Sequence, residues 1–270
     1  MAPTTICLIN QKGGCGKSST CFHLAGALVN EGLQVLLIDA DPQGSLSQGF
    51  FGPEHVEQLF PDQTTAALFE EDSFRFPTSE LIQTTVFDGI FVCPANQRLA
   101  PFNTPSPERD GVSQFALREF IEDKPAFDIV LIDCPPNLYR CSWAAMVAAD
   151  WVIIPVPPED FGTQGLRAVH QAIQNARLLN PPLRRLGHLV TRYDCRLIVH
   201  RSYEQRLRDL YGELVLETVI PEASAFKVAL ACRKPVEFCS RRSKAAVLTR
   251  ALAREILDRI AMKNAQRHVA

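Results

Sequence analysis

A glycine-rich stretch near the N-terminus carries residue types suited to binding phosphate. Residues 11–19 read QKGGCGKSS and lie between an apolar run and a helical pattern. Glycines let backbone amides turn toward phosphate oxygens, and the start of a helix adds a favourable dipole. In such a loop a lysine reaches the β- and γ-phosphates and a hydroxyl ligates Mg²⁺, roles that suit Lys17 and Ser18. The expected phosphate-binding residues are Gly13, Gly14, Cys15, Gly16, Lys17, Ser18 and Ser19.

Acidic residues follow directly after two further apolar runs. Residues 36–44 read LLIDADPQG, and residues 130–136 read VLIDCPP. The carboxyl ends of the strands in an open α/β sheet form the edge that binds ligand, so these acids are expected beside the phosphate loop. Phosphoryl transfer needs a metal ion that neutralises charge and a group that orients water. Asp133, at the end of its apolar strand, is expected to hold Mg²⁺ through water.

The phosphate loop departs from the usual GxxxxGK[ST] pattern, because Gln11 stands at its first position and Lys12 adds a second lysine. The order KGGxGK[ST], with DPQG and DCPPN further on, resembles the deviant Walker A family of ParA and MinD ATPases. The resemblance implies ATP and Mg²⁺ as cofactors and a homodimer that sandwiches ATP. It also implies that Lys12 contacts the phosphates of the partner's nucleotide. Asp41 would then position the attacking water, and Asp39 would bind Mg²⁺ or a water on it.

Three later stretches extend the resemblance over nearly the whole chain. Residues 155–161 (PVPPEDF) resemble a dimer-facing loop, where Glu159 is expected to contact the partner's lysine or nucleotide. Thr191 and Arg192 resemble the loop on the adenine side. Pro221 belongs to a segment that resembles the one closing over the base.

Short apolar runs alternate with helical patterns along the chain, which favours a mostly parallel sheet covered on both faces. The expected strands are 5–10, 34–38, 89–93, 128–132, 151–156, 186–190 and 214–218. The expected helices are 18–30, 140–149, 163–179, 199–210 and 244–264. The predicted fold is α/β, a three-layer P-loop NTPase fold with a mostly parallel twisted sheet flanked by helices.

We expect a single ParA-type ATPase domain over residues 1–270. Residues 50–87, punctuated by Gly, Pro, Asp and Glu, are expected to form a small helical insertion. Residues 101–107, with three prolines, are expected to form a loop. Too few residues precede the first strand for a helix-turn-helix domain, so any DNA contact is expected from the ATPase domain itself.

The composition is that of an ordinary globular protein, with 46% hydrophobic and 21% charged residues among 270. The chain has no run of about 18 apolar residues, which argues against a transmembrane helix. Its first residues lack the basic region and cleavage site of a secretory signal. A cytoplasmic location is therefore expected.

Nine cysteines are scattered without CxxC pairs, so buried free thiols are expected rather than metal ligands. Cys15 fits either a small hydrophobic residue or, at a helix N-terminus among lysines, an activated thiol. Cys134 follows Asp133 immediately. This spacing does not match the cysteine ligands of the related nitrogenase iron protein, which disfavours a metal-carrying reductase.

Charge is unevenly distributed although the net formal charge is only −2. Residues 227–270 contain eleven Lys and Arg against three Asp and Glu, which gives +8 there and −10 on the remainder. Such asymmetry indicates contact with a polyanion, and a solvated basic face is the alternative. Many relatives have a DNA-contacting arginine after the proline at 221, where this chain has Glu222. Non-specific binding of double-stranded DNA is therefore expected from Lys227, Arg233, Lys234, Arg241 and Arg242.

Two functions within the family stay open. The favoured one is a ParA-type ATPase that hydrolyses ATP to ADP and phosphate, binds nucleoid DNA as an ATP dimer and is stimulated by a ParB-like or other adaptor. Its cargo would be a plasmid, a chromosome or a protein assembly such as a carboxysome. The alternative is a MinD-like ATPase that binds membrane through its C-terminal helix. That helix offers Ile256, Leu257, Ile260 and Met262 but no Phe or Trp that inserts strongly, which disfavours the membrane.

Overall fold

Seven strands form one sheet in the order β3-β4-β2-β5-β1-β6-β7. The computed structural model describes residues 2–70, 80–105, 111–124, 126–158 and 163–269. Neighbouring strands pair in parallel, except that β3 runs antiparallel to β4. The strands are β1 (Thr4–Leu8), β2 (Val35–Asp39), β3 (Gln83–Thr84), β4 (Ile90–Cys93), β5 (Ile129–Asp133), β6 (Trp151–Val156) and β7 (Arg184–Val190).

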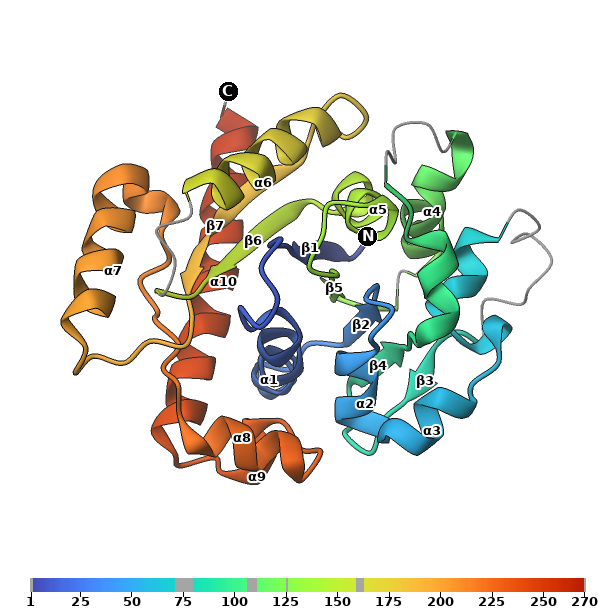
Figure 1. Ribbon diagram of the computed structural model, residues 1–270, viewed down its shortest axis with the longest axis horizontal. Helices are drawn as coiled ribbons and strands as arrows, with labels where there is room; N and C mark the ends of the chain where they lie inside the picture. The colour runs from blue at the N-terminus through green and yellow to red at the C-terminus, as the bar shows by residue number, and fades with distance from the viewer. Residues whose placement is uncertain (1, 71–79, 106–110, 125, 159–162, 270) are drawn as a thin grey trace.

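Helices cover both faces of the sheet (Figure 1). They are α1 (Lys17–Asn30), α2 (Ser45–Phe51), α3 (Pro53–Gln58), α4 (Ala116–Glu122), α5 (Arg140–Ala148), α6 (Thr163–Ala176), α7 (Ile198–Tyr211), α8 (Ser224–Ala231), α9 (Val236–Cys239) and α10 (Lys244–Val269). Short 3₁₀ helices are η1 (Pro61–Gln63), η2 (Thr65–Phe69), η4 (Gln97–Phe102), η6 (Gly111–Phe115) and η7 (Gly212–Leu214).

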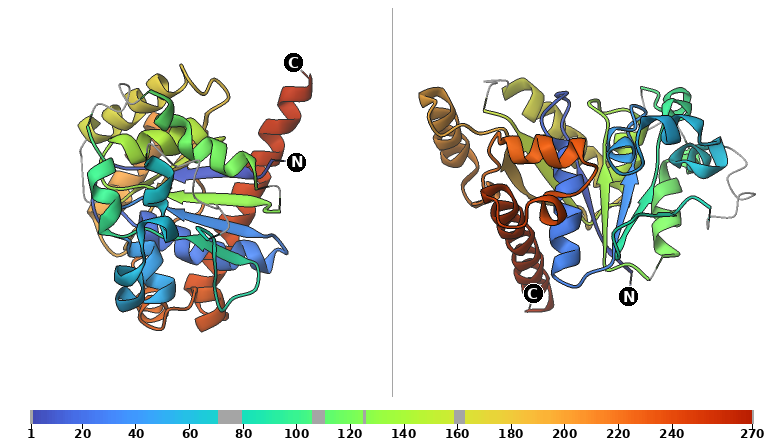
Figure 2. Two further views of the ribbon diagram at one scale, coloured as in Figure 1. Left: turned by 90° about the vertical axis from the view of Figure 1, so that its right-hand side faces the viewer. Right: turned by 90° about the horizontal axis from the view of Figure 1, so that it is seen from below.

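The apolar runs of the central strands supply two cores, one on each face of the sheet. Because successive side chains of a strand point to opposite faces, Leu36 and Ile38 pack in one core while Val35 and Leu37 pack in the other. The first core includes side chains of α4, α5, α6 and α7, and the second those of α1 and α10. The side views show the sheet between these helical layers (Figure 2). The predicted three-layer α/β architecture is thus confirmed.

The predicted strand at 214–218 is wrong. Among the described residues, Val215 makes one isolated bridge to His188, and η7 precedes it. The chain then leaves the sheet, because the backbone amides of Glu217 and Thr218 donate to the carboxylate of Glu255 on α10. These two amides are therefore not available for hydrogen bonds to β7, which a further strand would need.

The predicted helical insertion at 50–87 is right only for its first part. Helices α2 and α3 and the turns η1 and η2 bring the chain to Phe69, whereas Gln83 and Thr84 form the edge strand β3. Residues 71–79 lie outside the described residues. Helices α4, α8 and α9 were not predicted. With seven, eight and four residues, they are too short to be stable without tertiary packing, so their local pattern is weak.

Candidate nucleotide-binding site

The phosphate loop joins the end of β1 to the start of α1, at the edge where β1, β5 and β2 lie side by side. Gly14 has φ 70° and Gly16 has φ 91°, backbone conformations that residues with a side chain rarely adopt. Gly16 is the N-cap of α1, and no side chain caps this helix. The first amides of α1 therefore remain available for an anion.

Two side chains from neighbouring elements fix the shape of the loop. Asn10 donates from Nδ2 to the Pro155 carbonyl at 2.7 Å and accepts the Lys12 amide at 3.0 Å. Thr191, just after β7, donates its hydroxyl to the Cys15 carbonyl at 2.7 Å. The loop is thus held from both sides before any ligand binds. Sequence reasoning missed the role of Asn10, although a polar residue ending an apolar strand was a signal.

Lys17 lies inside the loop with only 6% of its surface exposed. Its Nζ donates to the carbonyls of Asn10 and Lys12 at 3.2 and 3.3 Å. Phosphate oxygens can replace these neutral acceptors, and a charged partner binds an ammonium more strongly. Cys15 is buried beneath this lysine, and burial raises the pKa of its thiol. Of the two interpretations of Cys15, these observations favour a small hydrophobic residue and do not support an activated thiol.

Asp133 provides a buried carboxylate with unused acceptors. It is 0% exposed, and neither of its oxygens has a hydrogen-bond partner among the described residues. Burial raises the pKa of Asp133 well above its ordinary range, the nearby Asp39 adds to this shift, and Ser18 and Lys17 oppose it. A buried, unpartnered carboxylate opposite a hydroxyl fits a hydrated Mg²⁺, whose ligands usually include one or two carboxylates and the phosphates of the substrate. The predicted placement of Ser18 and Asp133 suits this ion.

Asp39 pairs in register with Asp133 across β2 and β5, but its oxygens already have partners. One oxygen accepts from the Ser47 amide at 2.9 Å and its hydroxyl at 2.6 Å, and the other accepts the Asp41 amide at 3.1 Å. Burial raises the pKa of Asp39 to about 7. Through these contacts Asp39 holds the loop after β2, and its role toward Mg²⁺ stays a prediction.

Asp41 lies on that loop and faces the phosphate site. Its Oδ1 accepts the Gln43 amide at 2.9 Å, which orients the carboxylate. The residue is 8% exposed, and burial raises its pKa. Asp41 lines the same pocket as the phosphate loop, and its role in orienting a water molecule stays a prediction.

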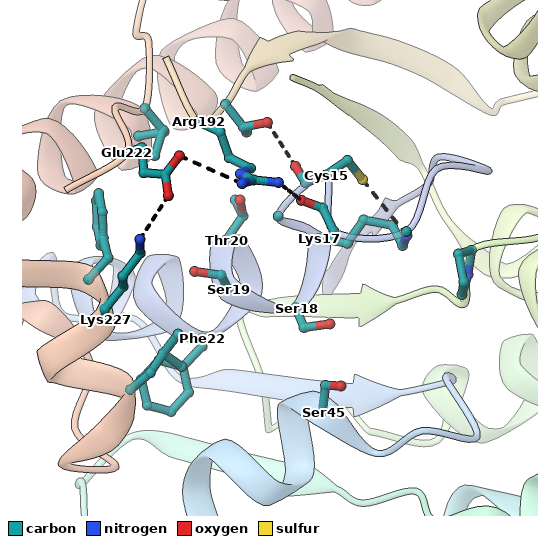
Figure 3. A pocket seen from close by; sticks show the side chains of 18 of the residues that line it. Cys15, Lys17, Ser18, Ser19, Thr20, Phe22, Ser45, Arg192, Glu222 and Lys227 are labelled. Atoms are coloured by element: carbon teal, nitrogen blue, oxygen red, sulfur yellow. Dashed lines mark hydrogen bonds and ion pairs between the residues drawn. The ribbon is translucent and has the colours of Figure 1, made fainter. Parts of the chain in front are cut away.

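A pocket of about 530 Å³ begins at the phosphate loop and extends toward α8 (Figure 3). This volume is in the range of ligand pockets. It brings together the predicted residues Gly13, Gly14, Cys15, Gly16, Lys17, Ser18, Ser19, Asp41, Thr191, Arg192 and Pro221. It also takes in Ile220, from the segment expected to close over the base, and residues that the sequence did not single out for nucleotide binding, namely Thr20, Phe22, Gln43, Ser45, Pro136, Glu222, Ala223, Phe226, Lys227 and Leu230.

Arg192 closes over the loop from the end of β7. Its φ of 53° is uncommon for a residue with a side chain and is typical of strained backbone at functional sites. Its Nη1 donates to the Gly14 carbonyl at 3.3 Å. The next residue, Tyr193, forms a bridge to Pro221, so the two segments predicted for the adenine side lie side by side.

Comparison with known proteins agrees with this geometry. Residues 3–184 match a family described as an AAA domain. Over 258 residues the chain is 33% identical to the chromosome-partitioning ATPase Soj of Thermus thermophilus, covering 94% of this chain and 96% of that one. It is 31% identical to the chromosome partitioning protein ParA of Myxococcus xanthus, covering 98% and 92%. The chain belongs to the ParA/MinD superfamily of partition ATPases.

Solved structures of this superfamily share the fold. The cell division ATPase MinD of Pyrococcus furiosus is 25% identical with a TM-score of 0.71, covering 94% of this chain and 98% of that one. A protein described as cobyrinic acid a,c-diamide synthase from Mycobacterium smegmatis, with bound ADP and magnesium, is 27% identical. Its TM-score is 0.76, and 94% of each chain is covered.

The deviant lysine of the ParA/MinD pattern, Lys12, is not among the residues that line the nucleotide pocket. It lines a separate cavity of about 290 Å³ with Val156, Pro157, Leu166 and Tyr203. This cavity lies beside the end of β6 and the helices α6 and α7. Glu159, the residue predicted to meet the partner, lies outside the described residues.

The five basic residues predicted to contact DNA are all exposed on the segment from α8 to the start of α10. Two of them are paired within the chain. Lys227 binds Glu222 at 2.8 Å, and Arg241 binds Glu237 at 3.0 Å. Arg233, Lys234 and Arg242 have no ion pair among the described residues.

The C-terminal helix α10 packs along α1, and its Ile256 and Ile260 are buried in the second core. Met262 is 63% exposed. The apolar residues considered for membrane insertion therefore serve mainly as the packed face of α10. Within the described part of the chain, no helix has the length and apolar character needed to cross a bilayer.

Proposed function

We propose that this chain binds ATP with Mg²⁺ and hydrolyses it to ADP and phosphate. The family membership and the pocket at the phosphate loop support this proposal. Lys17 and the amides of Gly13 to Ser18 would hold the phosphates. Ser18 and Asp133 would hold Mg²⁺, which when bound neutralises charge that develops on the phosphates. Asp41 would orient the attacking water, and Asp39 would fix the loop that carries Asp41.

We further propose that ATP drives formation of a homodimer in which Lys12 reaches the partner's nucleotide. One observation carries this proposal: Lys12 lines a cavity beside β6 and α6 rather than its own nucleotide pocket. A lysine in the phosphate loop that served only its own nucleotide would be expected in the pocket, as Lys17 is. Glu159 is proposed to lie at the same interface.

The dimer is proposed to act as a partition ATPase on the nucleoid. Two copies of the α8–α10 segment would double the exposed basic surface, and Lys and Arg contacts to phosphates give affinity without sequence preference. An adaptor of the ParB type or another class would stimulate hydrolysis and release the cargo-bound ATPase from DNA. The cytoplasm, at the nucleoid, is the proposed location.

Light scattering with ATP, ADP and no nucleotide tests the dimer. Wild-type protein is expected to double in mass with ATP only. Lys12→Gln is expected to stay monomeric with ATP while its affinity for ADP changes less than about twofold, since Lys12 lies outside the pocket. Lys124→Gln, which removes a lysine just after α4, is the matched control and should dimerise normally. Loss of ADP binding by monomeric Lys12→Gln, or normal dimerisation of this variant, would contradict the proposal.

A further inference from the structure

The end of the pocket farthest from Lys17 is made by residues 220–230 (Figure 3). Ile220, Pro221 and Phe226 give it an apolar lining that suits a flat aromatic ring. The phosphates of a nucleotide are confined to the N-terminus of α1. The pocket runs from there toward α8, so the base of that nucleotide falls at this end.

Three charged side chains cross this end of the pocket in a row, as Figure 3 shows. Lys227 donates from Nζ to Oε1 of Glu222 at 2.8 Å, and Nη2 of Arg192 lies 3.6 Å from Oε2. The hydrogen bond from Lys227 lowers the pKa of Glu222, which keeps this carboxylate ionised at neutral pH. Arg192 and Lys227 can only donate hydrogen bonds, whereas an ionised carboxylate can only accept them.

The row therefore places an acceptor between two donors where a base would lie. A carboxylate has about four acceptor positions, and the hydrogen bond from Lys227 together with the ion pair to Arg192 leaves part of this capacity unused. Adenine carries an amino donor at position 6 between the ring acceptors N1 and N7. An acceptor flanked by donors is complementary to that edge. The side chain of Glu222 is 39% exposed, so it can turn toward a ligand while it keeps its contact with Lys227.

We propose that Glu222 accepts a hydrogen bond from the 6-amino group of adenine and so makes the site selective for ATP over triphosphates that lack this amine. The inference rests on the proposed function, since a nucleotide must occupy the pocket. It gives a role in nucleotide recognition to the position where many relatives carry a DNA-contacting arginine. Lys227 then belongs first to the nucleotide pocket, where it holds this carboxylate.

Competition against a fluorescent ATP analogue tests the proposal, with ATP and purine riboside triphosphate as competitors. The second compound lacks only the 6-amino group. Wild-type protein is expected to prefer ATP by roughly tenfold, because a hydrogen bond to an ionised carboxylate is stronger than one between neutral groups. Glu222→Ala is expected to bring the ratio of the two affinities close to one. Glu222→Gln keeps an acceptor oxygen and should retain part of the preference.

Glu217→Ala is the matched control, because it removes an acidic side chain that is 81% exposed and lies outside the nucleotide pocket. This variant should keep the full preference for ATP. Equal affinity of wild-type protein for both triphosphates, or a full preference in Glu222→Ala, would overturn the inference and leave the proposed function intact. With GTP as a third competitor, a preference for GTP that Glu222→Ala abolishes would also overturn it, in favour of guanine. Failure of wild-type protein to bind any triphosphate would overturn the proposed function as well.

Discussion

On the basic surface between α8 and α10, we expect the side chains without an ion pair to another part of the chain to contribute most to DNA binding. Lys234 and Arg242 are exposed and have no ion pair among the described residues, whereas Arg241 is held by Glu237. We expect Lys234→Gln with Arg242→Gln to weaken binding of the ATP dimer to duplex DNA of any sequence. ATP-driven dimerisation should be unchanged, since neither residue lines the nucleotide pocket or the cavity around Lys12.

The size of the effect depends on how many DNA phosphates the variant dimer no longer neutralises. The double substitution removes two positive side chains per protomer and four per dimer. Each neutralised phosphate contributes about 0.9 to the slope of log affinity against log salt, which is roughly eightfold in affinity at about 0.1 M salt. If half of the four side chains bind phosphates, affinity falls about 60-fold and the slope falls by about 1.8.

Fluorescence anisotropy with two unrelated duplexes over a range of salt measures both quantities. Arg98→Gln with Lys124→Gln removes the same charge from η4 and from just after α4, outside the α8–α10 segment of the chain, and serves as the control. Both duplexes should be affected equally by the test variant and hardly at all by the control. A salt slope that stays at the wild-type value, with affinity within twofold, would refute the assignment of this surface to DNA.

Three further outcomes are expected. Lys17→Ala should abolish nucleotide binding in a titration with a fluorescent analogue, whereas Asp41→Ala should bind ATP and accumulate as a dimer with little phosphate release; a monomer with intact ATP affinity would contradict the role of Asp41. Arg250→Met should lower the free energy of unfolding by about 2 kcal/mol in urea titration, because the buried Glu237 loses its partner at 2.6 Å and keeps only the exposed Arg241 at 3.0 Å; a change below 1 kcal/mol, on the order of an exposed pair, would show that solvent screens this contact. Burial lowers the pKa of His23 to about 3. As the pH falls, this imidazole is therefore protonated in the unfolded chain before it is protonated in the folded protein. Stability should therefore fall by roughly 1.4 kcal/mol per pH unit below about 6.5, with the loss complete near the folded pKa, and His23→Asn should show a flatter profile in acid denaturation.

Local signals predicted the phosphate loop and most of the sheet. The loop is one contiguous stretch between a strand and a helix. The spacing of its glycines and lysines was therefore sufficient to locate it in the sequence. Apolar runs identified six strands because those strands are buried on both faces. The run at 214–218 has the same apolar pattern, but the amides of Glu217 and Thr218 donate to the carboxylate of Glu255, some 38 residues later, so no strand forms there.

Tertiary structure decided which residues act together at the far end of the pocket and on the basic surface. Arg192, Glu222 and Lys227 meet only because the loop after β7 bridges to the segment before α8. In the sequence, Glu222 was only a departure from a familiar pattern, and Lys227 only one of several charges. A side chain's partners depend on how distant segments pack, so residue type gives its chemistry while the fold determines which ligand, solvent or opposite charge that chemistry meets.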